Sequence, residues 1–259
     1  METQLLPLGD QLRAWRGRRR LSQLDLALDA EISARHLSFL ETGRSRPSRS
    51  MLLRLAERLA IPARDRNLLL VAAGFAPALP ERPLDDPALA AARRAVDLVL
   101  KAYEPFPALA IDRHWHKVAA NAGVAPLLVG VAPHLLEPPV NVLRLSLHPE
   151  GVAPRIVNLP EWRAHIFHRL DAQIEASADL VLAELLAELR AYPGGTSHAV
   201  DSYGGVAVPL VLRAGGEDLS FLSTTTMFGT PIDITLAELA IEAFLPADAR
   251  TADLLMAGG

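Results

Sequence analysis

Two groups of histidines and carboxylates have spacings that could hold a metal ion. The first group alternates, which on a strand puts its members on one face, and the second has the spacing of one helix face; imidazole and carboxylate are ordinary zinc ligands. The groups are Asp112, His114 and His116, and Glu161, His165 and His168. Both patterns are weak, because the first falls in an expected turn and eight histidines suffice for chance pairs. We expect no metal and no other cofactor.

The chain lacks the usual signatures of an enzyme active site. It has no cysteine, which excludes thiol nucleophiles, thiolate metal sites and disulfides. It also has no Gly-x-Ser-x-Gly elbow, phosphate-binding glycine loop, dinucleotide fingerprint or His-Glu-x-x-His helix. Thr196, Ser197 and His198 are adjacent, but they follow Tyr192 and Pro193 in what we expect to be a loop. We therefore expect no enzymatic activity.

Arginines are concentrated at the N-terminal end. Residues 1–80 contain 13 arginines, no lysine and 8 acidic side chains, a net charge of +5. The rest of the chain carries −9, so the overall charge of −4 hides two parts of opposite sign. A basic segment joined to an acidic one predicts that only the first meets a polyanion.

Several polar side chains in the basic segment have the chemistry of a DNA-reading surface. Arg35 falls near the start of an expected helix, where its guanidinium could form a bidentate contact with a guanine edge. Other members, such as Gln23 at the start of the preceding helix, could bind phosphates and fix the docking pose. The predicted DNA contacts are Gln23, Ser33, Ala34, Arg35, His36, Ser38, Arg44, Arg46 and Arg49.

Short helices must position these side chains. Ser22 forms a capping box with Asp25, Ser33 can cap the next helix, and Gly43 can end it. Caps eleven positions apart predict a helix-turn-helix, whose second helix enters the major groove. Five helices are expected, over residues 9–20, 23–28, 34–42, 48–59 and 63–73. The core face of the helix-turn-helix would hold Leu26, Ala27, Ile32, Leu37 and Leu40.

The chain divides at a proline-rich stretch. Residues 74–87 contain four prolines, which break helical hydrogen bonding. We therefore expect a first domain over residues 1–75, a linker over 76–87 and a second domain over 88–259. The second domain has a mixed pattern: helices over 86–103, 161–175, 179–192 and 235–244, and two strand hairpins over 108–112 with 117–120 and 205–213 with 219–228. The last helix is inferred from a capping box, Thr235 with Glu238.

The first domain resembles the XRE (Cro/repressor-like) helix-turn-helix family over about residues 8–70. The segments that carry the resemblance are Leu21-Ser22-Gln23, Asp25-Leu26-Ala27, Ile32-Ser33, Phe39-Leu40-Glu41-Thr42-Gly43-Arg44 and Arg46-Pro47-Ser48. Further segments look like regulators that join this motif to an MmyB-like ligand-binding domain. They are Arg66-Asn67-Leu68-Leu69-Leu70, Ala72-Ala73-Gly74, Asp112-Arg113-His114-Trp115, Ala120-Asn121, Pro139-Val140-Asn141-Val142-Leu143-Arg144 and Phe228-Gly229-Thr230-Pro231.

The resemblance implies a multi-domain fold: an all-α helix-turn-helix domain followed by an α+β, PAS-like domain whose antiparallel sheet cups a cavity. It also implies binding of fatty-acid-like molecules. The expected ligand-binding residues are Phe106, Trp115, Val118, Leu143, Arg144, Trp162, Ile166 and Phe221. For a carboxylate ligand, the candidate charge partners are Arg144, Arg155 and His148.

These features predict a sequence-specific DNA-binding transcription regulator that senses an apolar small molecule. One small reading head contacts few base pairs, so we expect a homodimer on a palindromic, double-stranded operator, with heads roughly 34 Å apart. The alternative is a protein-interaction regulator, of antitoxin or scaffold type, whose acidic second domain binds a partner protein. No apolar run reaches the roughly 18 residues of a membrane span, and no secretory signal is evident, so we expect a cytoplasmic protein without a membrane partner.

Overall fold

The computed structural model describes residues 6–197, 208–228 and 233–257 of the chain. The chain divides into two compact units between Glu81 and Arg82, within the proline-rich stretch, and Asp233 and Ile234 go with the first unit. Some expectations from the sequence fall wholly or partly outside the described residues, among them the first five residues of the first domain. Others concern His198, the first residues of the strand over 205–213, the segment 229–231 and the end of the chain.

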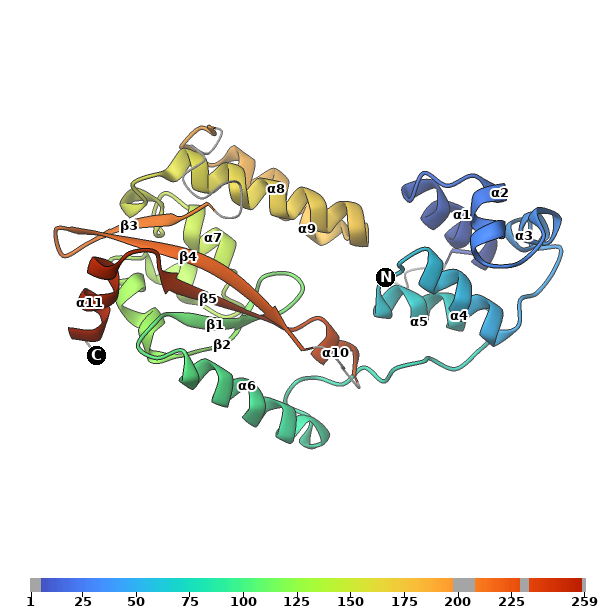
Figure 1. Ribbon diagram of the computed structural model, residues 1–259, viewed down its shortest axis with the longest axis horizontal. Helices are drawn as coiled ribbons and strands as arrows, with labels where there is room; N and C mark the ends of the chain where they lie inside the picture. The colour runs from blue at the N-terminus through green and yellow to red at the C-terminus, as the bar shows by residue number, and fades with distance from the viewer. Residues whose placement is uncertain (1–5, 198–207, 229–232, 258–259) are drawn as a thin grey trace. The chain divides into compact units, whose positions relative to one another are not determined.

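The first unit contains the five expected helices (Figure 1). They are α1 (Leu8–Arg18), α2 (Gln23–Asp29), α3 (Ala34–Glu41), α4 (Arg49–Arg58) and α5 (Ala63–Ala72). Serines cap three of them: the Oγ atoms of Ser22, Ser33 and Ser48 accept hydrogen bonds from backbone N–H groups three residues on, at 3.1, 3.1 and 3.2 Å. The Ser22 N–H donates back to Asp25 at 3.0 Å, which confirms the predicted capping box.

The second unit is built on one antiparallel sheet with the strand order β2-β1-β5-β4-β3. Its strands are β1 (Ala108–Ile111), β2 (Lys117–Ala120), β3 (Leu210–Ala214), β4 (Glu217–Met227) and β5 (Ala240–Pro246). Both predicted hairpins are confirmed, since β1 pairs with β2 and β3 pairs with β4. The second hairpin turns at Gly215 and Gly216, both with positive φ, as expected of a tight turn.

The predicted helix over residues 235–244 is wrong. The helix α10 (Ile234–Ala237) is a single turn, and the following residues form β5, the central strand. The Thr235 hydroxyl, expected to cap this helix, instead donates to the Arg82 carbonyl of a distant segment at 2.6 Å. Ala243 pairs with β1 on one side and β4 on the other. Pairing with strands distant in the sequence therefore overrides the local helix signal.

Helices cover both faces of this sheet (Figure 1). One face packs against α6 (Ala90–Ala102) through small residues such as Ala108 and Ala110. The opposite face holds the larger core, with Leu109 and Ile111, beneath α7 (Val142–Leu147), α8 (Leu159–Ser177) and α9 (Leu180–Ala191). A last helix, α11 (Ala249–Ala257), packs on β4, where Thr251 accepts from the Ser220 N–H at 3.0 Å. Successive β1 residues thus serve two different cores.

Across the described ranges, no helix has both the length and the hydropathy that crossing a membrane requires.

Candidate nucleic-acid interface and ligand cavity

The pair α2 and α3 forms a helix-turn-helix whose inner face is fully packed. Leu26, Leu37 and Leu40 are almost completely buried, and Ala27 is buried between them. The Ile32 N–H donates to the Ala27 carbonyl at 2.9 Å and closes the turn between the helices. The opposite face of α3 carries polar side chains, as predicted, together with the half-buried ring of Phe39.

Two arginines flank the Phe39 ring on the outward side of α3: Arg35 belongs to the helix, and Arg44 to the loop after it. Arg35 is exposed, and its guanidinium lies 5.4 Å from the ring centroid of Phe39, one helical turn on. The guanidinium of Arg44 lies 6.0 Å from the same centroid. Such cation–π contacts hold both charges near the surface. Phe39 is not among the DNA contacts predicted from the sequence, although it lies four residues after Arg35, the spacing at which side chains meet on one helix face.

The remaining predicted DNA contacts differ in exposure. Ser33, Arg46 and Arg49 are exposed, whereas Ala34, His36 and Ser38 are half-buried. Gln23 has another partner, because its Nε2 donates to Glu41 Oε2 at 2.8 Å.

Glu41 is the buried centre of a polar network that joins three helices. Its side chain is 0% exposed and accepts from Arg16 at 2.7 and 3.0 Å as well as from Gln23. Arg13 donates to its backbone carbonyl at 3.0 Å. Burial alone would raise the pKa of Glu41, but the hydrogen bonds from Arg16 and Gln23 and the nearby positive charge hold this pKa below its ordinary value. The network fixes α1 and α2 against the end of α3.

The second unit contains an apolar cavity of about 100 Å³ on the sheet face that carries α7 and α8. Four of the residues expected to bind the ligand line it: Trp115, Leu143, Trp162 and Ile166. The rest of the lining comes from β1 to β3, β5, the segment between β2 and α8, and α8 itself. It comprises Leu109, Lys117, Val124, Leu127, Leu128, Val140, Val142, Leu145, Ser146, Val152, Arg169, Leu210, Leu212, Glu242 and Phe244.

The other four expected residues lie outside this cavity. Val118 alternates with Lys117 on β2 and therefore faces α6, and Phe106 precedes β1 with its side chain half-buried. Phe221 is fully buried in the core. Arg144 forms a two-pronged ion pair with Glu188, at 2.8 and 2.7 Å. The sequence does not separate residues that line the cavity from those that pack in the core or on the other face of the sheet.

The cavity wall carries charges that differ from those expected. Arg169 pairs with the buried Glu242 at 2.7 Å, and its guanidinium lies 4.8 Å from the Trp115 ring centroid. Lys117 is exposed and forms no ion pair within the described part of the chain. The earlier candidates are placed elsewhere: Arg155 donates to the Leu127 carbonyl, while Arg144 and His148 do not line the cavity. The sequence could have indicated Arg169 as a lining residue, because positions 162, 166 and 169 lie on one face of α8, and Trp162 and Ile166 line the cavity.

A tight turn between β1 and β2 holds Trp115 in the cavity. Asp112 Oδ1 accepts from the backbone N–H groups of His114 and His116, both at 2.8 Å. Trp115 has a φ of +67°, uncommon for a bulky residue, and its Nε1 donates to Gln173 at 2.9 Å.

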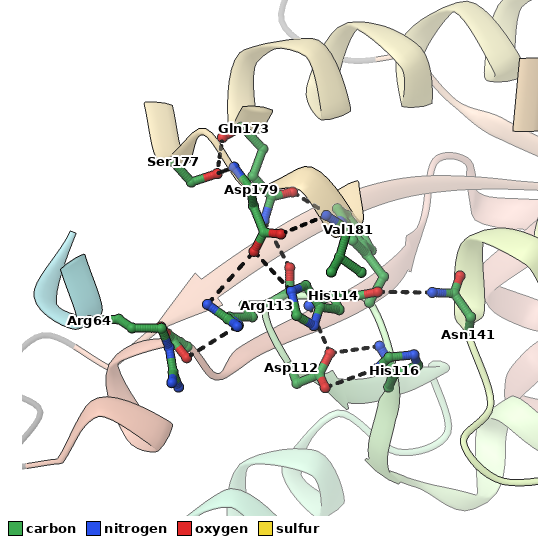
Figure 2. Close-up of polar contacts among 12 residues, drawn as sticks. Arg64, Asp112, Arg113, His114, His116, Asn141, Gln173, Ser177, Asp179 and Val181 are labelled. Carbon is green, nitrogen blue, oxygen red and sulfur yellow. Dashed lines mark hydrogen bonds and ion pairs between the residues drawn. The ribbon is translucent and has the colours of Figure 1, made fainter. Parts of the chain in front are cut away.

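The two metal-binding groups considered from the sequence are not assembled in the described residues. His114 Nε2 lies 2.8 Å from Asp179 Oδ2, whereas His116 Nδ1 lies 3.1 Å from Asp112 Oδ2 (Figure 2). Burial would raise the pKa of Asp179, but the hydrogen bond from His114 holds it below its ordinary value. In the second group, His165 stacks on Trp162 with a centroid separation of 5.3 Å, and burial lowers the pKa of His165.

Comparison with known proteins matches both units. Residues 92–257 match the family model of the MmyB-like transcription regulator ligand binding domain, and residues 7–69 match that of a helix-turn-helix domain. Two crystal structures of the clp gene regulator ClgR from Corynebacterium glutamicum are also similar. One is 30% identical and covers 26% of this chain and 83% of its own; the other is 28% identical and covers 38% and 90%; both have a TM-score of 0.23. No curated protein matches the chain.

Proposed function

Because the chain belongs to the family of MmyB-like transcription regulators, we propose that it is a DNA-binding regulator whose cavity takes an amphiphilic small molecule, a fatty acid, as its controlling ligand. The apolar cavity with charge on its wall is the observation that carries this proposal. Side chains such as Leu143 and Ile166 suit an alkyl chain, as in other small-molecule pockets. We also propose that the second unit has a PAS-like sensor fold, because its antiparallel sheet borders this apolar cavity.

Lys117 is the cation available to a ligand carboxylate. Arg169 also lines the cavity, but its charge is already balanced by Glu242 at 2.7 Å. Lys117 has no such partner among the described residues, and a carboxylate there would gain a charge-assisted hydrogen bond. The alkyl chain would then run past Trp115 into the apolar part of the cavity.

Tryptophan fluorescence tests ligand binding directly. Two of the three tryptophans, Trp115 and Trp162, line the cavity, so a bound fatty acid should change their emission. Val124→Phe fills cavity space and should weaken binding at least tenfold. The matched control, Val118→Phe, makes the same change outside the cavity and should leave affinity unchanged. Equal affinities for both variants, or no emission change in the natural protein, would refute the cavity as the ligand site.

Lys117→Gln separates the headgroup contact from the apolar contact. Loss of a hydrogen bond to a charged group costs roughly 1.5–3 kcal/mol, or about 10- to 150-fold in affinity. The variant should therefore bind the fatty acid more weakly, yet bind the corresponding fatty alcohol as the natural protein does. An equal effect on both ligands would remove Lys117 from the carboxylate site.

We also propose that two copies bind one palindromic operator. The short helix α3 offers few base contacts, and paired heads about one helical turn apart supply the missing specificity. Sedimentation velocity of the protein with and without operator DNA measures this, with two chains per duplex expected. One chain per duplex at saturating protein would contradict the proposal.

A further inference from the structure

Three side chains with metal-binding chemistry lie together on the second unit, away from the groups noted in the sequence. His134 belongs to the short 3₁₀ helix Pro133–Leu136, His148 directly follows α7, and Glu150 lies two residues further. Each offers one ligand atom, and these atoms lie within 4.8 Å of one another. None of the three lines the apolar cavity. His134 and His148 lie fourteen positions apart in the sequence, a spacing that no local helix or strand pattern would bring together.

The backbone around this cluster is well fixed. The Ala132 N–H donates to the Glu150 carbonyl at 2.9 Å. This hydrogen bond joins the segment before His134 to the turn after α7. Gly151 closes that turn, since a Cβ there would lie 3.2 Å from the Leu145 carbonyl carbon and closer still to its oxygen. The cluster is therefore presented by two segments already bonded to each other.

The imidazole of His148 is also oriented by its neighbours. Its ring meets the rings of His134 and Tyr192 edge to face, with centroid separations of 5.6 and 5.0 Å. The Glu150 N–H donates to His148 Nδ1 at 3.1 Å, which leaves Nε2 as the nitrogen able to face an ion. Metal binding at Nε2 would move the proton to Nδ1 and give up this one hydrogen bond.

The charges nearby do not oppose a cation. Glu150 is exposed and supplies one negative charge. The Arg144 charge near Tyr192, whose ring contacts His148, is balanced, because Arg144 pairs with Glu188, which also accepts from the Tyr192 hydroxyl at 2.5 Å. A divalent cation in the cluster would therefore meet the Glu150 carboxylate, and the Arg144 charge is already paired with Glu188.

We propose that His134, His148 and Glu150 bind a divalent transition-metal ion of the zinc class. Two imidazoles and a carboxylate suit zinc, and a water molecule would complete its tetrahedral shell. The ion would link the 3₁₀ helix to the end of α7. The chain between them supplies Val140, Val142 and Leu143 to the apolar cavity, so the metal would brace one cavity wall.

Zinc titration of the tag-free full chain, after chelator treatment, tests the proposal. In competition with a chromophoric chelator, the natural protein should bind one zinc ion per chain. Loss of a residue that only hydrogen-bonds to a metal ligand typically lowers metal affinity by roughly 10- to 100-fold. His134→Gln combined with His148→Gln removes two ligands and should lower zinc affinity by more than that. The matched control is His168→Gln, which replaces an exposed histidine outside the cluster and should leave zinc binding unchanged.

Two further measurements keep the test decisive. Glu150→Gln alters one exposed side chain, preserves its shape and should also weaken zinc binding. Cobalt(II) in place of zinc should give the intense visible absorption of a tetrahedral site in the natural protein and not in the double variant. Unchanged zinc affinity in the double variant, or equally tight binding of magnesium, which prefers all-oxygen sites, would overturn the proposal.

Discussion

Single side chains on α3 and in the loop after it divide into those that could read bases and those that could only hold phosphates. Arg35 lies in the first turn of α3, exposed and steadied by Phe39. Arg46 lies beyond the helix, in the exposed loop before α4. This difference in place predicts a difference in sequence selectivity.

Arg35→Ala should therefore weaken binding to the preferred operator by roughly 1–3 kcal/mol while leaving binding to random duplex nearly unchanged. Arg46→Ala should weaken both, and should reduce the slope of log K against log salt by about 0.9 per lost phosphate contact. Fluorescence anisotropy on both duplexes at several salt concentrations measures these effects. Equal loss on both duplexes for Arg35→Ala would exclude base reading by that residue.

Glu41 supports a stability prediction at the same scale. Glu41→Gln leaves the Arg16 guanidinium, with only 16% of its side chain exposed, without its charged partner. Breaking such a pair costs roughly 3 kcal/mol in the free energy of unfolding. Urea denaturation at neutral pH measures the loss. Glu31→Gln is the control, since its ion pair with Arg54 spans 3.8 Å and is exposed, and it should change little.

The same variant should reveal a pH dependence. The pKa of Glu41 is lowered on folding, so its contribution is present above the ordinary value of 4.5 and is lost as pH falls through the folded-state pKa. The stability gap between the natural protein and Glu41→Gln should therefore narrow in acid. A gap that stays constant from neutral pH to about pH 3 would show that the network does not depend on the ionised carboxylate.

At the scale of elements, two glycines in α1 have opposite roles. A Cβ at Gly9 would lie 2.8 Å from the Glu41 carbonyl carbon and closer still to its oxygen, so α1 contacts α3 through bare backbone. Gly17 has no atom within 4 Å of such a Cβ. The sequence alone does not separate these two positions.

Gly9→Ala should destabilise the protein by roughly 1–3 kcal/mol through overpacking, despite the better helix propensity of alanine. Gly17→Ala should stabilise it by up to about 1 kcal/mol, because only propensity changes there. Thermal denaturation of the two variants side by side gives the comparison. Stabilisation of both would mean that α1 and α3 can separate at little cost.

Local signals predicted the elements that are stabilised locally. The serine caps place the starts of α2 and α3 correctly, because a cap bonds within its own first turn. β5 and the cavity lining depend on distant partners. The segment 235–244 begins like a helix, yet its later residues form β5 and pair with β1 and β4. Phe221 and Trp162 are both apolar aromatic residues that the sequence does not tell apart, although only Trp162 lines the cavity. Helix periodicity could have placed Arg169 beside Trp162, whereas nothing local brings His134 near His148.

At the scale of the whole molecule, the net charge of +5 over residues 1–80 and of −9 over residues 81–259 predicts separate roles for the two parts of the chain. The basic N-terminal part meets DNA, and the acidic remainder is repelled by it. A ligand in the cavity can then change DNA binding only if it binds one state of the protein more tightly than another. The proposed control is thus a coupling free energy between two sites, and such coupling is reciprocal.

This reciprocity gives the last prediction. If saturating fatty acid changes operator affinity by some factor, saturating operator must change fatty-acid affinity by the same factor, and typical couplings are about 5- to 150-fold. Anisotropy of labelled operator measures one side of the cycle, and emission of Trp115 and Trp162 measures the other. In Val124→Phe the coupling should vanish while the affinity of the ligand-free protein for operator stays unchanged. A factor of one on both sides would mean that the ligand binds without regulating, and would leave the DNA-reading surface and the cavity as independent functions.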